Sequence, residues 1–179
     1  MIQNNTVVQG VGNVKNYKHY PKIIVLTLPL REEPTTFPPL GSLSVITALK
    51  KSGFENTHFY NLDVLRPKYK EILAFLEKEN PDIIGISAIV STGYGFTKKL
   101  SLDIKKLLPK TTILLGGNLG ASAEILLKKT GVDFICSGEG ERTVVSFVYC
   151  WLNAESKNSF NDVDSLAFLD EQGKLVMTS

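Results

Sequence analysis

Short apolar runs alternate with longer amphipathic segments along most of the chain. The run from Ile23 to Leu26 is continuously β-branched or aliphatic, which is typical of a strand covered on both faces in a parallel sheet. A loop rich in Pro and Thr follows it, and then a helix from about Gly41 to Lys51, with Gly53 as its stop. The same pattern predicts further strands at 57–62, 82–87, 112–115 and 133–136, and further helices at 67–78, 96–108, 122–129 and 143–152.

This regular alternation of strands and helices predicts the fold class. Strands joined through helices need crossover connections, so they form a parallel sheet with helices on both faces. We expect a doubly wound α/β fold whose mainly parallel, five-stranded sheet has the flavodoxin-like order. Segments 166–169 and 174–177 flank a polar turn and predict a β-hairpin, and residues 6–14 favour another short extended segment. The expected organisation is an extension at 1–21, the α/β domain at 22–153, and a linker with hairpin at 154–179.

Composition places the chain among ordinary globular proteins. Hydrophobic residues make up 43% and charged residues 21% of its 179 residues, and the net charge of +2 is spread without a basic run. Nucleic acid is therefore not an expected partner. Cys136 and Cys150 are too few for a disulfide framework or an iron–sulfur site, and the segment from Met1 to Tyr20 lacks the apolar core of a signal peptide or membrane span. These features favour a soluble, cytoplasmic protein without a membrane partner.

Small residues gather in the loops that follow the predicted strands. In an open sheet of this class, ligands bind outside the carboxyl ends of the strands. Each loop alone is better explained by tight turns and helix caps, but together they favour a site for a large flat ligand. The candidate residues are Thr35, Thr36, Phe37, Pro39, Leu40 and Gly41 after the first strand, Ser87, Ser91 and Thr92 after the third, Gly116, Gly117 and Asn118 after the fourth, and Gly138, Glu139, Gly140 and Glu141 after the fifth.

Missing motifs narrow the choice of ligand. The first strand is not followed by Gly-x-Gly-x-x-Gly, and Gly-x-x-x-x-Gly-Lys occurs nowhere, which disfavours dinucleotide and P-loop nucleotide sites. Asp63 alone does not restore the dinucleotide interpretation. A phospho-acceptor receiver domain needs an aspartate after the third strand and a lysine after the fifth, where Ser87 and Ser137 stand.

The order of the loop motifs carries a resemblance to a known family. Pro-Leu-Gly stands at 39–41, Pro-Asp-x-x-Gly-x-Ser at 81–87, Gly-Gly at 116–117, and Val-Asp-Phe at 132–134 leads to Gly-Glu-Gly-Glu at 138–141. In this order and spacing the chain, from about Lys22 to Ser179, resembles the N-terminal cobalamin-binding domain of cobalamin-dependent radical S-adenosylmethionine (SAM) proteins.

The resemblance implies how cobalamin would be held. The corrin ring would lie across the strand ends, and the nucleotide tail would enter beside Ser87, Ser91, Gly116 and Gly117, flanked by the turn at 138–141. A bulky residue at Gly117 is then expected to block the tail. The first loop lacks the histidine of the Asp-x-His-x-x-Gly motif found in the methionine-synthase type, and His19 and His58 fall elsewhere. Cobalt would therefore have no protein imidazole ligand, leaving its lower side to a side chain or water from the region 35–37.

The resemblance also implies where catalysis would reside. The family's radical domain holds its [4Fe-4S] cluster with Cys-x-x-x-Cys-x-x-Cys, which this sequence lacks, so the cluster and S-adenosylmethionine would belong to a further domain. Glu139 and Glu141 form either a paired acid or hydrogen-bonding carboxylates of a turn. We expect a cobalamin-binding domain without its own catalytic centre, which supports methyl transfer or related radical chemistry through a radical SAM domain in cis or trans. The alternatives are a flavodoxin-like or nucleotide-sugar-binding protein, and a docking scaffold.

Overall fold

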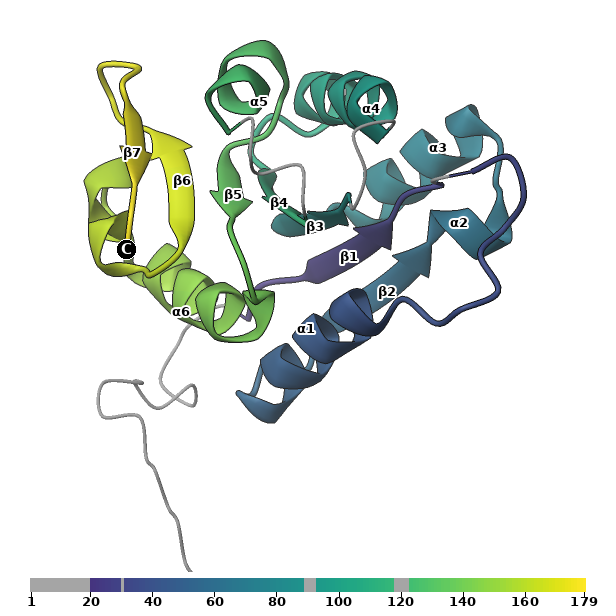
Figure 1. Ribbon diagram of the computed structural model, residues 1–179, viewed down its shortest axis with the longest axis horizontal. Helices are drawn as coiled ribbons and strands as arrows, with labels where there is room; N and C mark the ends of the chain where they lie inside the picture. The colour runs from purple at the N-terminus through teal and green to yellow at the C-terminus, as the bar shows by residue number, and fades with distance from the viewer. Residues whose placement is uncertain (1–19, 30, 89–92, 118–122) are drawn as a thin grey trace, which may run out of the picture.

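A seven-stranded sheet forms the middle layer of the protein (Figure 1). The computed structural model describes residues 20–29, 31–88, 93–117 and 123–179. Its strands follow the order β2-β1-β3-β4-β5-β6-β7 across the sheet. The strands are β1 (Ile23–Thr27), β2 (Thr57–Asn61), β3 (Ile83–Ser87), β4 (Thr112–Gly116), β5 (Phe134–Cys136), β6 (Leu166–Leu169) and β7 (Leu175–Met177). The helices are α1 (Leu40–Lys51), α2 (Leu62–Leu65), α3 (Tyr69–Glu79), α4 (Tyr94–Leu107), α5 (Ala123–Lys129), α6 (Gly140–Asn153) and the 3₁₀ helix η4 (Lys157–Asp162).

Strand order and direction confirm the expected fold class. Strands β1 to β5 run parallel in the flavodoxin-like order, and the chain crosses over through a helix after each of the first four. The predicted hairpin is present and belongs to the same sheet, because β6 pairs antiparallel with β5 and β7 pairs antiparallel with β6. It thereby covers the free edge of the short strand β5 with backbone partners.

Helices cover the two faces of the sheet. Helices α3, α4 and α5 lie over one face, and α1 and α6 lie over the other (Figure 1). Alternation along β1 divides its side chains between these layers: Ile24 and Leu26 pack in the first core cluster, and Ile23 and Val25 in the second. Burial on both faces explains why this strand is a continuous apolar run in the sequence.

The second predicted strand ends one residue early, because a short helix follows it. The Asn61 side chain accepts hydrogen bonds from the backbone N–H groups of Asp63 and Val64, at 3.1 and 3.2 Å. This N-cap starts α2 at Leu62, which the apolar pattern had assigned to the strand.

Two other helices begin earlier than the sequence pattern predicts. Helix α4 starts at Tyr94 rather than Phe96, and α6 starts at Gly140 rather than Thr143. The second shift moves Gly140 and Glu141 from the predicted loop into the first turn of a helix.

The predicted linker after α6 also contains structure. Helix η4 buries Phe160, whose ring centroid lies 4.5 Å from that of Phe134 and 5.2 Å from that of Phe147. This aromatic contact anchors the segment before the hairpin to the core. Residues 6–14, Ser91, Thr92, Asn118 and the predicted helix start at Ser122 lie outside the described residues. Within the described ranges, no helix combines the length and hydrophobicity needed to cross a membrane.

Candidate ligand site at the strand ends

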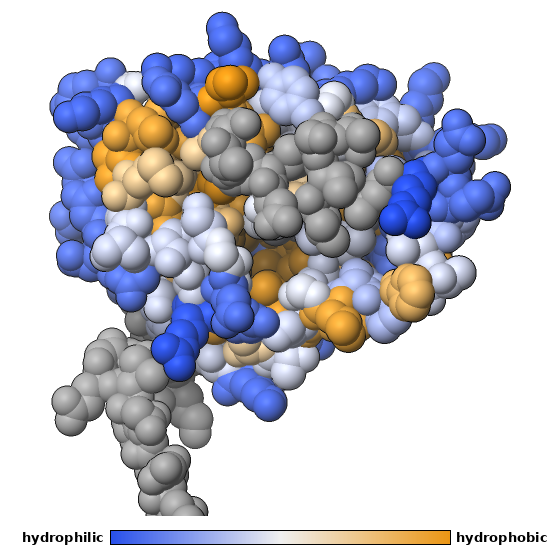
Figure 2. Space-filling model, in the orientation of Figure 1, coloured by the Kyte–Doolittle hydropathy of each residue, from blue (hydrophilic) through white to orange (hydrophobic). Residues whose placement is uncertain are grey.

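A pocket of about 680 Å³ lies between the sheet and helices α1 and α6. We refer to it as the groove. Figure 2 shows hydrophobic atoms at the bottom of a hollow in this part of the surface. Apart from Ile86, its sheet-side lining comes from alternate positions of neighbouring strands, and its helical walls include one stripe of each helix. The lining residues are Ile23, Val25 and Thr27 of β1, Ile83, Gly85 and Ser87 of β3, Leu114 and Gly116 of β4, Cys136 of β5, Ser42, Val45 and Leu49 of α1, and Val144 and Val148 of α6.

Strand register sorts these residues by depth. Val25 pairs with Gly85, which pairs in turn with Leu114, so these three residues form one layer across the sheet. Thr27 and Ser87 stand two residues nearer the carboxyl ends and belong to the mouth of the groove. The deeper layers therefore contain apolar side chains, and hydroxyl groups are confined to the mouth.

Glycine leaves room in the sheet wall. A Cβ atom added at Gly116 would have no heavy atom of the described residues, apart from its chain neighbours, within 4 Å. One added at Gly85 would make only an ordinary contact with Val25, at 3.7 Å. Any other residue at Gly116 would therefore extend into the groove, so glycine there keeps the space open.

Gly117 has a different role. Its φ is +101°, a conformation that L residues rarely adopt, and an added Cβ would lie 2.3 Å from the carbonyl oxygen of Ala88. Glycine at 117 is thus required for the backbone turn after β4 and for its close approach to the chain after β3. Although Gly117 lines the groove, a bulky replacement there would disturb the fold before it could block a ligand.

Two buried hydroxyl groups meet at the mouth of the groove. Thr27 Oγ1 and Ser42 Oγ are 2.9 Å apart, and either can be the donor. One hydroxyl proton is used between them, which leaves the other proton for a further acceptor. This pair can donate one hydrogen bond to a ligand in the groove.

A second polar contact joins the walls. Ser44 of α1 donates a hydrogen bond to Glu141 of α6 at 2.5 Å. This hydrogen bond holds the pKa of the Glu141 carboxyl below its usual range. A hydrogen bond from the backbone N–H of Glu141 lowers the pKa further, and burial opposes both to a smaller extent. The charged carboxylate thus ties together the amino-terminal turns of the two helices beside the mouth.

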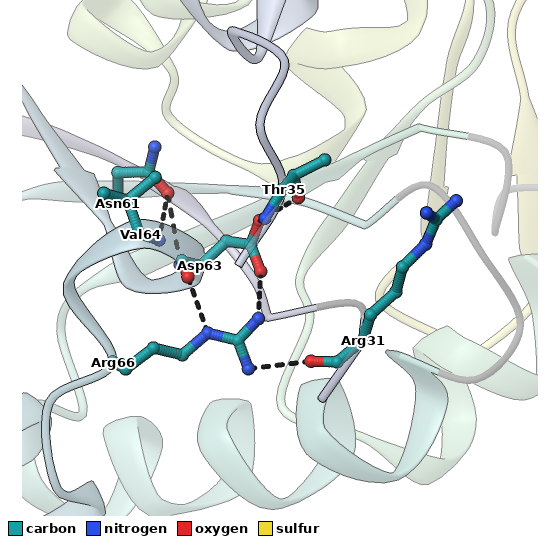
Figure 3. A network of polar contacts seen from close by, with 6 residues as sticks. All are labelled: Arg31, Thr35, Asn61, Asp63, Val64 and Arg66. Carbon is teal, nitrogen blue, oxygen red and sulfur yellow. Dashed lines mark hydrogen bonds and ion pairs between the residues drawn. The ribbon is translucent and has the colours of Figure 1, made fainter. Parts of the chain in front are cut away.

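The loop between β1 and α1 is held in place by Asp63 (Figure 3). The carboxylate of this buried residue accepts hydrogen bonds from the backbone N–H of Thr35, at 3.0 Å, and from the Thr35 hydroxyl. Arg66 forms an ion pair with the other carboxylate oxygen at 2.6 Å and donates to the backbone carbonyl of Arg31 at 2.7 Å. Two positions of the loop are therefore fixed to α2, and Asp63 and Thr35 both line the groove.

Large apolar side chains are exposed at the rim. Phe37 and Leu40 are 79% and 71% exposed, and Val64 on α2 is 53% exposed. All three line the groove. Their exposure next to an apolar opening is typical of a surface that covers a large ligand.

Cys136 lies in the groove as a neutral thiol. Burial raises its pKa, the negative charge of Glu141 adds to the increase, and a hydrogen bond with Thr143 opposes it. No group of three or more His, Cys, Asp and Glu residues in the described parts of the chain could hold a metal ion. His58 is an exposed residue of the edge strand β2 and is not part of the groove lining, and its Nε2 lies 2.8 Å from Asn56 Oδ1.

Most of the residues predicted from the strand-end loops line the groove. They are Thr35, Phe37, Pro39, Leu40, Gly41, Ser87, Gly116, Gly117, Gly138, Glu139, Gly140 and Glu141. Thr36 is exposed and is not part of the lining, and Ser91, Thr92 and Asn118 lie outside the described residues. Sequence reasoning missed the apolar interior and the Asp63 contacts. The alternate positions of buried strands carried a signal for the interior, whereas nothing in the sequence indicated which face the groove would occupy.

Comparison with protein families matches most of the chain, including most of the groove, to one family. The family model described as B12 binding domain matches residues 28–148. The sequence is 32% identical over 139 residues to the anaerobic magnesium-protoporphyrin IX monomethyl ester cyclase of Synechocystis sp., an overlap of 75% of this chain and 27% of that protein. The cyclase of the same name from Cereibacter sphaeroides is 26% identical over 137 residues, covering 75% of this chain and 22% of the relative. The chain thus spans about a quarter of the length of these relatives.

Solved structures share the fold. The radical S-adenosylmethionine methyltransferase TsrM from Kitasatospora setae, with cobalamin and a [4Fe-4S] cluster bound, matches with a TM-score of 0.72 at 18% identity, over 88% of this chain and 29% of that chain. The cobalamin-dependent S-adenosylmethionine radical enzyme OxsB, with aqua-cobalamin and S-adenosylmethionine bound, matches with a TM-score of 0.71 at 23% identity, over 88% of this chain and 22% of that chain. At these identities the similarity establishes a common fold.

Proposed function

The chain belongs to the B12-binding domain family, and from this premise we propose that the groove beneath α1 and α6 receives the nucleotide tail of cobalamin. The family match agrees with the resemblance carried by the strand-end loops. The observation that carries the proposal is the groove itself, an apolar space of about 680 Å³ that opens at the carboxyl ends of parallel strands. The match does not favour the flavodoxin-like, nucleotide-sugar-binding or scaffold alternatives.

The lining suits the chemical parts of the tail. A benzimidazole base is flat and apolar, and the layer of Val25, Gly85 and Leu114 offers apolar contacts with a glycine at its centre. The hydroxyl pair of Thr27 and Ser42 can donate one hydrogen bond to the ring nitrogen of a base that has left cobalt. The groove thus supports the base without a charged side chain in its deep part.

The rim suits the corrin ring. Phe37, Leu40 and Val64 would cover part of one apolar face of the macrocycle, and their burial by the ring would reduce exposed apolar surface. The amide groups around a corrin ring are hydrogen-bond donors, and the carboxylates of Glu139 and Glu141 at the groove are acceptors for them. Asp63 would act as a positioning residue, because it fixes the loop that carries Thr35 and Phe37.

Cobalamin supplies a cobalt centre that can carry and transfer an alkyl group. We propose that this chain provides the cobalamin module of a cobalamin-dependent radical SAM protein, and that a radical SAM domain in the same protein performs the reaction. The proposal is supported by the named relatives, of which this chain spans about a quarter, and by the solved radical SAM enzymes that share its fold. A Cys-x-x-x-Cys-x-x-Cys motif in the coding sequence beyond Ser179 would support it, and a stop codon there would contradict it.

Retention of cobalamin tests the binding proposal. Purified protein is mixed with hydroxocobalamin and, in parallel, with flavin mononucleotide and a uridine diphosphate sugar, and free ligand is removed by gel filtration. We expect the corrinoid alone to elute with the protein, with a visible spectrum that differs from the free form. Elution of protein without corrinoid at high micromolar concentration would contradict the proposal, and co-elution of the flavin or nucleotide sugar would favour the alternatives.

A further inference from the structure

We propose that the groove selects cobamides with a benzimidazole base over cobamides with a purine base. This inference rests on the proposed function, since it concerns which tail the groove accepts. It is drawn from the distribution of polar atoms in the groove, which is uneven between the mouth and the interior.

The interior of the groove has no polar side chain among the described lining residues. On the sheet side, below the layer of Thr27 and Ser87, the lining consists of Ile23, Val25, Ile83, Gly85 and Leu114. The apolar residues of the helical walls are Val45 and Leu49 on α1, and Val144 and Val148 on α6. The backbone groups of β3 are already used, because this strand pairs with β1 on one side and β4 on the other. Among the described residues, a base inserted here finds apolar contacts and no free donor or acceptor.

Hydrogen-bonding capacity is limited to the mouth. Thr27 and Ser42 together have one hydroxyl proton to spare, and Ser87 carries a further hydroxyl. The Cys136 thiol beside Gly116 is kept neutral by burial and shares a hydrogen bond with Thr143. A dimethylbenzimidazole base that has left cobalt has one free ring nitrogen, which is a single acceptor. The spare proton of the Thr27–Ser42 pair therefore satisfies the one acceptor of this base without any polar group in the interior.

Adenine fits this environment less well. It adds an exocyclic amino group with two donors and further ring nitrogens, and these would lose their water without gaining partners in the interior. An unpaired polar group in such a site commonly costs about tenfold or more in affinity. Adenine also leaves cobalt more readily than dimethylbenzimidazole because it is less basic, and this bias acts against the preference that we propose.

Binding of three corrinoids to the whole chain tests the inference. Dissociation constants are measured by visible titration for cobalamin, for the adeninyl cobamide and for cobinamide, which has no base. We expect the adeninyl cobamide to bind at least about tenfold more weakly than cobalamin. Adenine leaves cobalt more easily than dimethylbenzimidazole, so detachment of the base alone would favour binding of the adeninyl cobamide. Weaker binding of the adeninyl cobamide therefore cannot arise from detachment of the base.

Two variants locate the selectivity in the groove. Val45→Thr adds a hydroxyl to the wall at nearly constant volume and is expected to lower the ratio of the two dissociation constants at least about threefold. Val145→Thr, on α6 but outside the groove lining, is the matched control and should leave the ratio unchanged. The double variant Thr27→Val/Ser42→Ala removes both hydroxyls of the pair and should weaken binding of cobalamin several-fold and leave that of cobinamide unchanged. Circular dichroism of each variant verifies the fold. The free-energy cost of detaching the base from cobalt is the same for every variant, so it cancels when the variants are compared.

The outcomes separate this inference from the proposed function. Cobalamin binding with a ratio near one, or with a ratio that Val45→Thr does not alter, overturns the selectivity and leaves cobalamin binding in place. Absence of cobalamin binding by the unaltered chain overturns both. A ratio above about ten that falls in Val45→Thr and persists in Val145→Thr supports the inference.

Discussion

Two adjacent glycines are expected to respond in opposite ways to the same added methyl group. Gly117→Ala places a Cβ 2.3 Å from the carbonyl oxygen of Ala88 and forces alanine to a φ of +101°. Gly116→Ala places its Cβ where no heavy atom of the described residues, apart from its chain neighbours, lies within 4 Å. The first change should therefore damage the fold, and the second should fill part of the ligand groove.

The expected loss of stability for Gly117→Ala follows from two contributions. An L residue in this backbone region costs about 1–3 kcal/mol. Because real Cβ atoms essentially never approach other heavy atoms within 3.0 Å, the contact must open by 3.0 − 2.3 = 0.7 Å. That movement strains the 3.0 Å hydrogen bond from the Ala88 N–H to the Gly116 carbonyl, which is worth about 1 kcal/mol. We expect a total of about 2–4 kcal/mol, which lowers the melting temperature by roughly 5–15 °C.

Gly116→Ala should instead change ligand binding. Its free energy of unfolding is expected to stay within about 1 kcal/mol of the original or to rise, since alanine loses less backbone entropy than glycine. Overpacking of the groove should weaken cobalamin binding about tenfold or more.

Urea unfolding and cobalamin titration, carried out on both variants, measure the two effects. A Gly117→Ala protein as stable as the original would refute the role assigned to the turn. A Gly116→Ala protein that binds cobalamin unchanged would refute the position of the tail.

Three further results are expected. Asp63→Asn removes the ion pair with Arg66 and weakens the hydrogen bonds that hold Thr35. Urea unfolding should show a free energy of unfolding lower by about 1–2 kcal/mol, and cobalamin should dissociate faster. An unchanged dissociation rate would contradict the positioning role of Asp63. The lowered pKa of Glu141 stabilises the fold above the ordinary value of 4.5, and this stabilisation is lost as pH falls through the folded-state pKa. Ser44→Ala should thus be less stable than the original at neutral pH, and the difference should shrink as pH falls below 4.5, as paired urea melts would show. The raised pKa of Cys136 predicts that its thiol reacts slowly with a disulfide reagent at neutral pH. Because Cys136 lines the groove, methylcobalamin should slow this reaction further and methylcobinamide should not, and equal protection by both would argue against a tail in the groove.

The fold could be predicted from the sequence because its strands are buried on both faces. A continuous run such as Ile23 to Leu26 has few alternatives to a central parallel strand, and glycine and proline mark the ends of the neighbouring elements. The first residues of the helices were harder to predict. Asn61 begins α2 through its own side chain, a local contact that outweighed the apolar pattern. Gly140 enters α6 although glycine favours loops.

The candidate site was predictable at its rim and not in its interior. Residues after parallel strands must meet at one edge of the sheet, which is why Gly116 and Glu141 could be grouped from their positions alone. Val45 and Val144, by contrast, have the same pattern as any core position, and only the spacing between helices and sheet distinguishes a groove from a filled core. The contact between Asp63 and Thr35 spans 28 residues and has no local sequence signal.

The central claim is that the base of cobalamin leaves cobalt for the groove and that no protein imidazole replaces it. Electron paramagnetic resonance of protein-bound cob(II)alamin tests this most directly, because an axial nitrogen ligand splits the cobalt hyperfine lines. The account predicts a bound signal without nitrogen splitting, while free cob(II)alamin at the same neutral pH retains it. A bound signal that keeps the nitrogen splitting would mean that the base, or a histidine, remains on cobalt, and would contradict the account.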